Sequence, residues 1–113
     1  MIVTGGENVS PVEIEQCLSQ HQAVSEVAVV GLSDERWGQI VAAFVKQRVG
    51  VDAEELDRFC QQSGLANFKR PRRYVFVESL PRSPVGKLLR RKLVAGEYEP
   101  ALTAGPPPQG TAA

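Results

Sequence analysis

The fold is decided by the stretch VSEVAVVG at residues 24–31 together with IVAAFVKQRV at residues 40–49. β-Branched and apolar residues dominate both stretches, apart from the polar end of the second, and such residues favour strands. The intervening residues 33–38 predict a loop of moderate length. Two strands joined in this way favour antiparallel pairing, so the sequence predicts a sheet built around this pair.

Helical patterns flank the strand pair on both sides. Before it, Ser10 is the predicted N-cap and Pro11 the first residue of a helix, whose apolar face comprises Ile14, Cys17, Leu18 and His21. After it, Asp52 is predicted to cap a second helix that extends to about Ser63 and is ended by Gly64; its apolar face comprises Leu56, Phe59 and Cys60. We interpret His21 as a partly exposed residue near the helix end, because no second ligand stands nearby.

The apolar start of the chain, residues 2–4, predicts a short strand. A further strand at residues 73–78 and a basic helix at residues 86–95 complete the predicted order, β-α-β-β-α-β-α. This order predicts a small α+β domain with a mostly antiparallel sheet of about three main strands flanked by helices. The pattern assigns residues 1–99 to one domain. Residues 100–113 include three consecutive prolines and no apolar periodicity, which predicts a disordered tail.

Composition supports one small domain with a modest core, since the chain has 113 residues of which 42% are hydrophobic. No stretch approaches the length of a membrane span, and the N-terminus lacks the features of a secretory signal. The two cysteines, Cys17 and Cys60, have no metal-ligand spacing. We interpret them as free, buried core residues in a reducing compartment rather than as a disulfide.

Charge is distributed unevenly although the formal net charge is zero. Residues 1–68 carry a net charge of −6, whereas residues 69–92 hold nine Lys or Arg and a single acid. A positive patch of this kind favours phosphate-bearing partners, namely nucleotides, CoA, nucleic acid or an anionic membrane.

The segment LPRSPVGKLLRRKL, residues 80–93, is the most unusual part of that basic region. Prolines restrict the loop, and Gly86 lets the backbone turn before a helix start. Lys87 is therefore predicted at a constrained loop tip, where a lysine could reach toward an anion. From spacing alone, a solvated basic helix with an ordinary lysine is an equal alternative.

Further motifs decide between these alternatives: MIVTGGENVSP at residues 1–11 followed by VEIE, DERWG at residues 34–38, and FKRPR at residues 68–72. Together with Gly86-Lys87, in this order, they resemble the C-terminal domain of adenylate-forming enzymes. The resemblance covers residue 1 to about residue 93. It is best to acyl- and aryl-CoA synthetases, such as fatty-acid or chlorobenzoate CoA ligases, rather than to domains that load carrier proteins.

The resemblance implies a chemistry for Lys87. Such enzymes activate a carboxylic acid with ATP and Mg²⁺, release pyrophosphate, and then transfer the acyl group to CoA. A large N-terminal adenylation domain holds most of the acid and ATP pocket, and the small domain rotates between the two half-reactions. Lys87 matches the lysine of adenylate formation, and Gly86 gives its loop freedom. We expect this chain to be inactive alone and to work in the cytoplasm.

The resemblance also implies a CoA site. Gly5, Gly6, Glu7 and Asn8 match the loop that faces the active site during thioester formation; the alternative is a tight strand-to-helix turn that needs one glycine. A second group matches positions around the CoA nucleotide: Trp37, Phe68, Arg70 and Arg72. Trp37 could instead cap the sheet edge, and Phe68 could be core. No metal ligands are assigned, and ATP, Mg²⁺ and CoA are expected as substrates or activator of the whole enzyme.

Two other functions remain open from the residues. The basic segment at residues 69–92, with Tyr74 and Phe76 interleaved, could serve a stand-alone module that binds nucleic acid, although core packing explains these aromatics and no RNA-binding signature is present. A non-catalytic interaction domain is the other alternative, and the Gly86-Lys87 pair argues against it.

Overall fold

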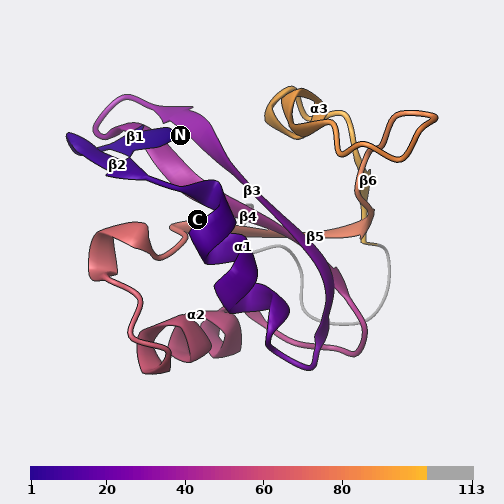
Figure 1. Cartoon of the computed structure of the whole chain (residues 1–113), viewed down its shortest axis with the longest axis horizontal. Coiled ribbons are helices and arrows are strands. Elements are labelled where there is room, and N and C mark those ends of the chain that lie inside the picture. Colours follow the sequence, from indigo (N-terminus) through magenta and orange to yellow (C-terminus); the bar gives the residue numbers. More distant parts are fainter. Residues whose placement is uncertain (102–113) are drawn as a thin grey trace.

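The computed structural model describes residues 1–101 and forms one mixed β-sheet with helices on both faces (Figure 1). The strands are β1 (Ile2–Thr4), β2 (Glu7–Val9), β3 (Val24–Asp34), β4 (Gly38–Gln47), β5 (Arg73–Ser79) and β6 (Glu99–Pro100). The helices are α1 (Pro11–Ser19), α2 (Ala53–Gln62) and α3 (Arg90–Val94), with a 3-10 turn at Asn67–Lys69. The α+β prediction is confirmed.

The β3–β4 hairpin is the longest pairing of the sheet and is antiparallel, as predicted, with Ala28 opposite Phe44. β1 pairs with β2 and with the start of β4 in antiparallel fashion, and β6 pairs antiparallel with β5. β4 and β5 are parallel, because α2 and the 3-10 turn carry the chain back to the same end of the sheet before β5 begins.

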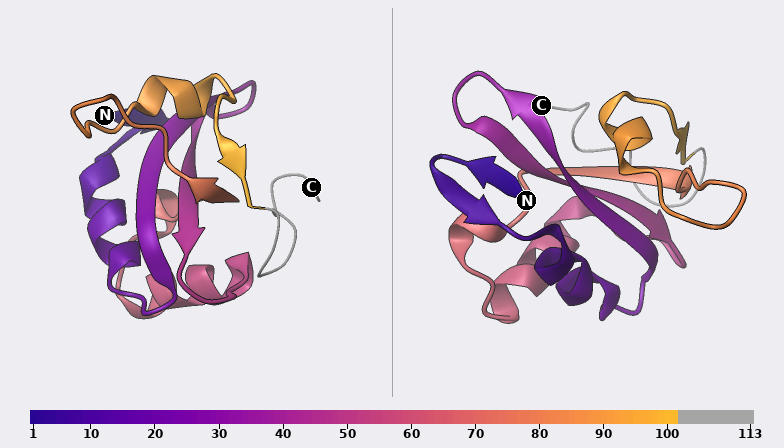
Figure 2. Two further views of the ribbon diagram at one scale, coloured as in Figure 1. Left: turned by 90° about the vertical axis from the view of Figure 1, so that its right-hand side faces the viewer. Right: turned by 45° about the horizontal axis from the view of Figure 1, so that its top comes forward.

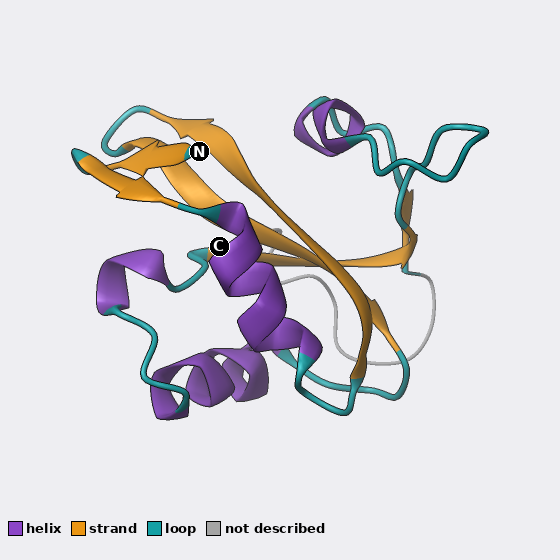
Figure 3. Cartoon of the chain, in the orientation of Figure 1, coloured by secondary structure: helices purple, strands orange, loops and turns teal. Residues whose placement is uncertain are grey.

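Two hydrophobic clusters cover the two faces of the sheet. Ile14 and Leu18 of α1 and Leu56 of α2 pack on one face with Tyr74 and Phe76 of β5. Leu93 of α3 packs on the other face, with the alternate β5 residues Val75 and Val77 and with Leu80. Figure 3 shows α1 and α2 together on one side and α3 on the other. Because both faces of β5 are buried at its centre, residues 74–77 form a continuous apolar run.

The helix ends show where local signals were sufficient. Asp52 caps α2 as predicted, since its Oδ1 accepts a hydrogen bond from the Glu55 amide at 2.8 Å. Ser10 precedes α1, and Pro11 is its first residue, but the Ser10 side chain makes no capping hydrogen bond. The expectation that both cysteines are buried is wrong for Cys17, which is half-buried, and correct for Cys60; both are free.

Two boundaries differ from the sequence prediction. The basic helix begins at Arg90 rather than Gly86, because residues 82–88 form a hairpin-like loop closed by a bridge between Arg82 and Leu88. Pro100 and Ala101, assigned to the tail, instead lie along β5, where the Ala101 amide donates to Phe76 O. The rest of the predicted tail, residues 102–113, lies outside the described residues.

Candidate functional site

Trp37 sits in the tight β3–β4 turn. The Asp34 carboxylate accepts hydrogen bonds from the amides of Arg36 and Trp37, at 3.0 and 2.8 Å. Gly38 follows with a φ of +81°, a conformation that side-chain-bearing residues rarely adopt. The DERWG motif therefore builds a rigid turn, with Trp37 on its surface.

Residues from two other segments converge on Trp37. The Gly5 amide donates to Trp37 O at 2.9 Å, and a Cβ at Gly5 would lie 3.0 Å from Cε3 of the indole. The Arg72 guanidinium carbon lies 4.1 Å from the centre of the Trp37 ring, a cation–π contact. Arg72 is held there by its own amide, which donates to Val41 O at 2.9 Å. The structure thus brings together Gly5, Trp37 and Arg72, three of the predicted CoA residues.

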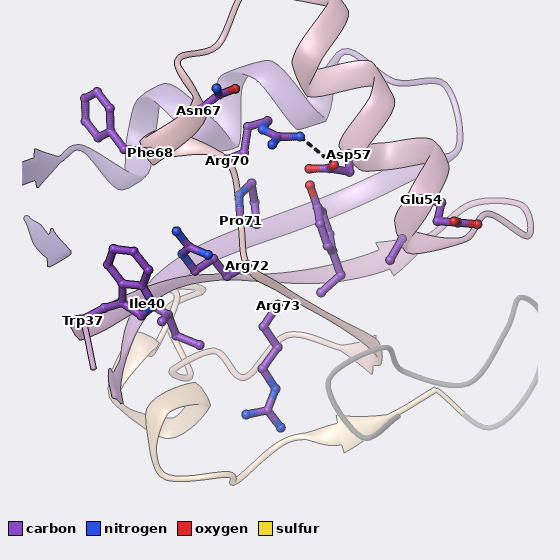
Figure 4. Close-up of a pocket in the computed structure, with 12 residues that line it drawn as sticks. Trp37, Ile40, Glu54, Asp57, Asn67, Phe68, Arg70, Pro71, Arg72 and Arg73 are labelled. Atoms are coloured by element: carbon purple, nitrogen blue, oxygen red, sulfur yellow. Dashed lines mark hydrogen bonds and ion pairs between the residues drawn. The ribbon is translucent and has the colours of Figure 1, made fainter. Parts of the chain in front are cut away.

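A surface cavity of about 850 Å³ adjoins this contact, between the turn, α2 and the segment that leads into β5. Figure 4 shows its lining, which comprises Trp37, Ile40, Ala53, Glu54, Asp57, Asn67, Phe68, Arg70, Pro71, Arg72, Arg73 and Tyr74. Phe68 is 40% exposed, so it is not a core residue. An exposed aromatic ring and an exposed guanidinium at one cavity could contact a nucleotide base and its phosphates.

Arg70 differs from the other predicted nucleotide residues. Its Nη1 lies 2.7 Å from Asp57 Oδ2 of α2, and Figure 4 shows the guanidinium turned toward that carboxylate. Arg70 Nε is buried and makes no hydrogen bond. The cation therefore joins the segment before β5 to α2, a contact that no local sequence pattern indicates.

The Gly5-Gly6 pair forms the two-residue turn between β1 and β2, with Thr4 opposite Glu7. Their φ values are +56° and +84°, so the turn itself uses both glycines. The turn therefore joins two strands, and not a strand and a helix as the alternative interpretation had it. A Cβ at Gly6 would have no atom within 4 Å, which leaves the outer side of the turn open to a ligand; Glu7 and Asn8 are exposed beside it.

Lys87 lies at the tip of the loop at residues 82–88, hereafter the Lys87 loop. Ser83 organises the loop: its amide donates to Lys87 O at 2.8 Å, its carbonyl accepts from the Gly86 amide at 2.8 Å, and its Oγ accepts from the Lys87 amide at 3.1 Å. Gly86 has a φ of +89°. Within residues 1–101 the exposed Lys87 ammonium has no hydrogen-bond or ion-pair partner, whereas the backbone beneath it is bonded.

The Lys87 loop and the Gly5-Gly6 turn lie at opposite ends of the domain (Figures 1 and 2). The Trp37 turn lies at the same end as the Gly5-Gly6 turn, to which it is hydrogen-bonded. The predicted site residues therefore form two separate groups rather than one centre.

Two titratable side chains, Tyr74 and Cys60, lie next to each other beneath the cavity. Tyr74 is 4% exposed, and Cys60 Sγ lies 3.8 Å from its hydroxyl. Burial raises the pKa of Cys60 to about 12 and raises the pKa of Tyr74 as well. Both groups stay protonated near neutral pH, so neither is a nucleophile there.

The basic segment is less available to a polyanion than its composition indicates. Four of its nine cations form ion pairs within the described chain: Lys69, Arg70, Arg82 and Arg90. Tyr74 and Phe76 are both buried, so neither can stack on a nucleic-acid base. No helix within residues 1–101 is long and apolar enough to cross a membrane.

The chain also matches a known protein family and several known proteins. A model of the AMP-binding enzyme C-terminal domain family matches residues 13–87. The chain is 53% identical over 96 residues to a 4-chlorobenzoate–CoA ligase of a Pseudomonas species, a match that covers 83% of this chain and 18% of the relative. It is 48% identical over 93 residues to a 2-succinylbenzoate–CoA ligase of Bacillus cereus, covering 82% of this chain and 19% of the relative.

The fold is shared with solved structures. A Mycobacterium tuberculosis fatty acyl CoA synthetase superposes with a TM-score of 0.80 at 42% identity, over 85% of this chain and 19% of that one. An o-succinylbenzoate CoA synthetase from Bacillus subtilis, solved with its acyl-adenylate intermediate, gives 0.77 at 39% identity, over 81% and 19%. The chain spans less than a fifth of the length of these relatives. It belongs to the AMP-binding enzyme C-terminal domain family.

Proposed function

We propose that this domain is the mobile C-terminal part of an ATP-dependent, AMP-forming acyl- or aryl-CoA ligase. Its partners in that function are an N-terminal adenylation domain, a carboxylic acid, ATP and CoA. The relatives supply the class of reaction, since several are CoA ligases for aromatic acids. The observation that carries the proposal is the placement of the Lys87 loop and of the Gly5–Trp37–Arg72 contact at opposite ends of the domain.

Lys87 serves adenylate formation. When the acid attacks the α-phosphate of ATP, negative charge grows on the phosphoryl oxygens, and a nearby ammonium stabilises it. The structure supports this role because the ammonium is exposed and unpaired within residues 1–101, on a loop whose backbone is hydrogen-bonded. No ion pair of this lysine within residues 1–101 has to break before its ammonium contacts a phosphate.

The opposite end serves thioester formation. The open outer side of Gly6 gives space for the pantetheine arm of CoA, and Glu7 and Asn8 flank it. Trp37, Phe68 and Arg72 border a cavity that could take the CoA nucleotide, with Arg70 supporting its wall. Rotation of the domain would present one end and then the other to the same adenylation site.

Mg²⁺ is proposed to accompany ATP on the adenylation domain. In the described part of this chain, no three His, Cys, Asp or Glu side chains lie close enough together to hold a metal ion. The chain alone is expected to lack ligase activity, and its two free thiols favour a reducing setting such as the cytoplasm.

The proposal is tested in a ligase that contains this domain and its adenylation domain. Lys87→Ala should slow acid-dependent pyrophosphate release by about 100-fold or more, because the ammonium that stabilises the charge on the α-phosphoryl oxygens is lost. It should leave thioester formation from supplied acyl-adenylate within about twofold. Arg91→Ala is the matched control, since it removes an exposed cation of the neighbouring helix and should change neither step. If Lys87→Ala matched the wild type in both steps, or slowed both steps to the same degree, the assignment would be refuted.

A further inference from the structure

The outer edge of β3 is where the Lys87 loop and α1 meet. β3 pairs with β4 along one side, and no described strand pairs with its other side. α1 packs on one face of the sheet and α3 on the other. Figure 2 shows α1 and the segment that carries the Lys87 loop and α3 on either side of β3. Side chains that reach around this edge are therefore the direct link between the two layers.

Two ion pairs make that link. Glu15 Oε2 of α1 lies 2.6 Å from Arg90 Nη2 at the start of α3. Glu26 Oε1 of β3 lies 2.9 Å from Arg82 Nη2 at the base of the Lys87 loop. The Arg82 guanidinium also donates from Nη1 to Gly86 O at 3.1 Å. One guanidinium thus connects Glu26 to the residue immediately before Lys87.

Glu15 makes a second contact that fixes its carboxylate. The same Oε2 accepts the Val29 amide of β3 at 2.9 Å, and the side chain is only 17% exposed. This amide belongs to the edge strand and would otherwise need another acceptor. The Glu15 carboxylate is therefore fixed between α1, β3 and α3, and its ion pair with Arg90 positions the start of α3.

We propose that Glu15 and Glu26 are positioning residues for Lys87: through Arg90 and Arg82 they fix both ends of the Lys87 loop on the β3 edge. The inference rests on the proposed role of Lys87 in adenylate formation. Catalysis by a delivered charge depends on the fraction of time that the charge occupies one place. A loop anchored at one end or at neither delivers Lys87 less often.

The first test measures amide hydrogen exchange in the 113-residue chain. Glu15→Gln keeps a side-chain oxygen for the Val29 amide but loses the charge that faces Arg90. The amides of Ser83, Gly86 and Lys87 should then exchange about 1.5- to 5-fold faster, the range given by exposed ion pairs. The difference between the variant and the wild type should fade in about 1 M salt, where the Debye screening length falls to about 3 Å.

A matched control lies on the same helix. Glu13→Gln removes an ion pair with Lys69 that does not involve the Lys87 loop, and it should leave the exchange of the loop amides unchanged. A double-mutant cycle identifies the route. If Glu15 acts through Arg90, then Glu15→Gln combined with Arg90→Gln should accelerate exchange no more than either change alone.

The second test separates this inference from the function on which it rests. In the whole ligase, Glu15→Gln and Glu26→Gln should lower kcat for adenylation by the same small factor as the loop opens, with KM for the acid and thioester formation from supplied adenylate unchanged. Unchanged loop exchange in Glu15→Gln would overturn the inference. Faster exchange with undiminished adenylation, while Lys87→Ala abolishes it, would also overturn it and leave the proposed function standing. If Lys87→Ala left adenylation intact, both the inference and the proposed function would be rejected.

Discussion

Arg70 and Arg72, two residues apart in one basic motif, should respond in opposite ways to the same substitution. Arg70 is paired with Asp57, whereas Arg72 stacks on Trp37 and is exposed beside the cavity. We predict that Arg70→Gln chiefly lowers stability and that Arg72→Gln chiefly weakens the use of CoA. The family resemblance implies a place at the CoA nucleotide for both residues.

The magnitudes follow from the two environments. The Arg70 and Asp57 side chains are 25% and 32% exposed, so their 2.7 Å pair is partly screened and its loss should cost about 1–2 kcal/mol. For a domain of this size that lowers Tm by roughly 4–8 °C per kcal/mol. The exposed Arg72 contact should cost about 0.5 kcal/mol. If Arg72 contacts a CoA phosphate, its loss should raise KM for CoA by about tenfold.

Two measurements distinguish the residues. Unfolding is followed by far-ultraviolet circular dichroism, because Trp37 fluorescence would report the Arg72 change directly. In double-mutant cycles, Asp57→Asn should couple to Arg70→Gln by about 1 kcal/mol and to Arg72→Gln by less than about 0.3 kcal/mol. Equal coupling to both arginines, or a larger rise in KM for CoA with Arg70→Gln, would refute this account of the cavity wall.

Other predictions concern the two helix caps and the two thiols. Asp52→Ala should cost about 1 kcal/mol of unfolding free energy, whereas Ser10→Ala should cost a few tenths, because only Asp52 makes a capping hydrogen bond; equal losses in chemical denaturation would contradict this. At pH 8 an alkylating reagent should modify half-buried Cys17 well before buried Cys60, as mass spectrometry would show. Since burial raises the pKa of Cys60 from 9.0 to about 12, its contribution to stability should be complete below pH 9 and decline as pH rises toward 12, a decline that Cys60→Ala should reduce.

Local signals predicted the central hairpin and α2 well. The stretch at residues 24–31 is rich in β-branched residues, and its consecutive residues Ala28, Val29 and Val30 are buried, so strand propensity and burial agree there. Asp52 and Gly64 bound α2 as expected, because a capping carboxylate and a left-handed glycine act within a few residues. The parallel β4–β5 pairing depends on where α2 returns the chain, which no local pattern states.

The start of the basic helix was misplaced for a similar reason. Gly86-Lys87 followed by basic and apolar residues is compatible with a helix start, and helical spacing continues through Arg91. In the structure, Ser83 and the Arg82–Leu88 bridge close a loop first, so the helix starts at Arg90. The Lys87 prediction is sharpened by this, since the lysine lies on a loop tip and not on a helix.

Ion pairs between residues far apart in the chain could not be predicted from the sequence. Glu15 lies within the VEIE motif, but its contact with Arg90 joins residues 75 positions apart. Asp57 and Arg70 are likewise separated by a helix end and a turn. An acid on a helix face is most often a solvated residue, so neither pairing could be distinguished from a surface charge before the fold was known.

The central claim is that two ends of one domain serve two half-reactions. The most direct test places one substitution at each end of the domain and measures each variant in both half-reactions, in the ligase that contains the domain. Lys87→Ala acts at one end; Gly6→Asn adds bulk at the other while tolerating the left-handed backbone, and Gly64→Asn, with a similar φ and open space, is its control.

The account predicts that Lys87→Ala abolishes pyrophosphate release and spares thioester formation, that Gly6→Asn does the reverse, and that Gly64→Asn changes neither. Two substitutions that slow the same half-reaction, or both half-reactions equally, would contradict it.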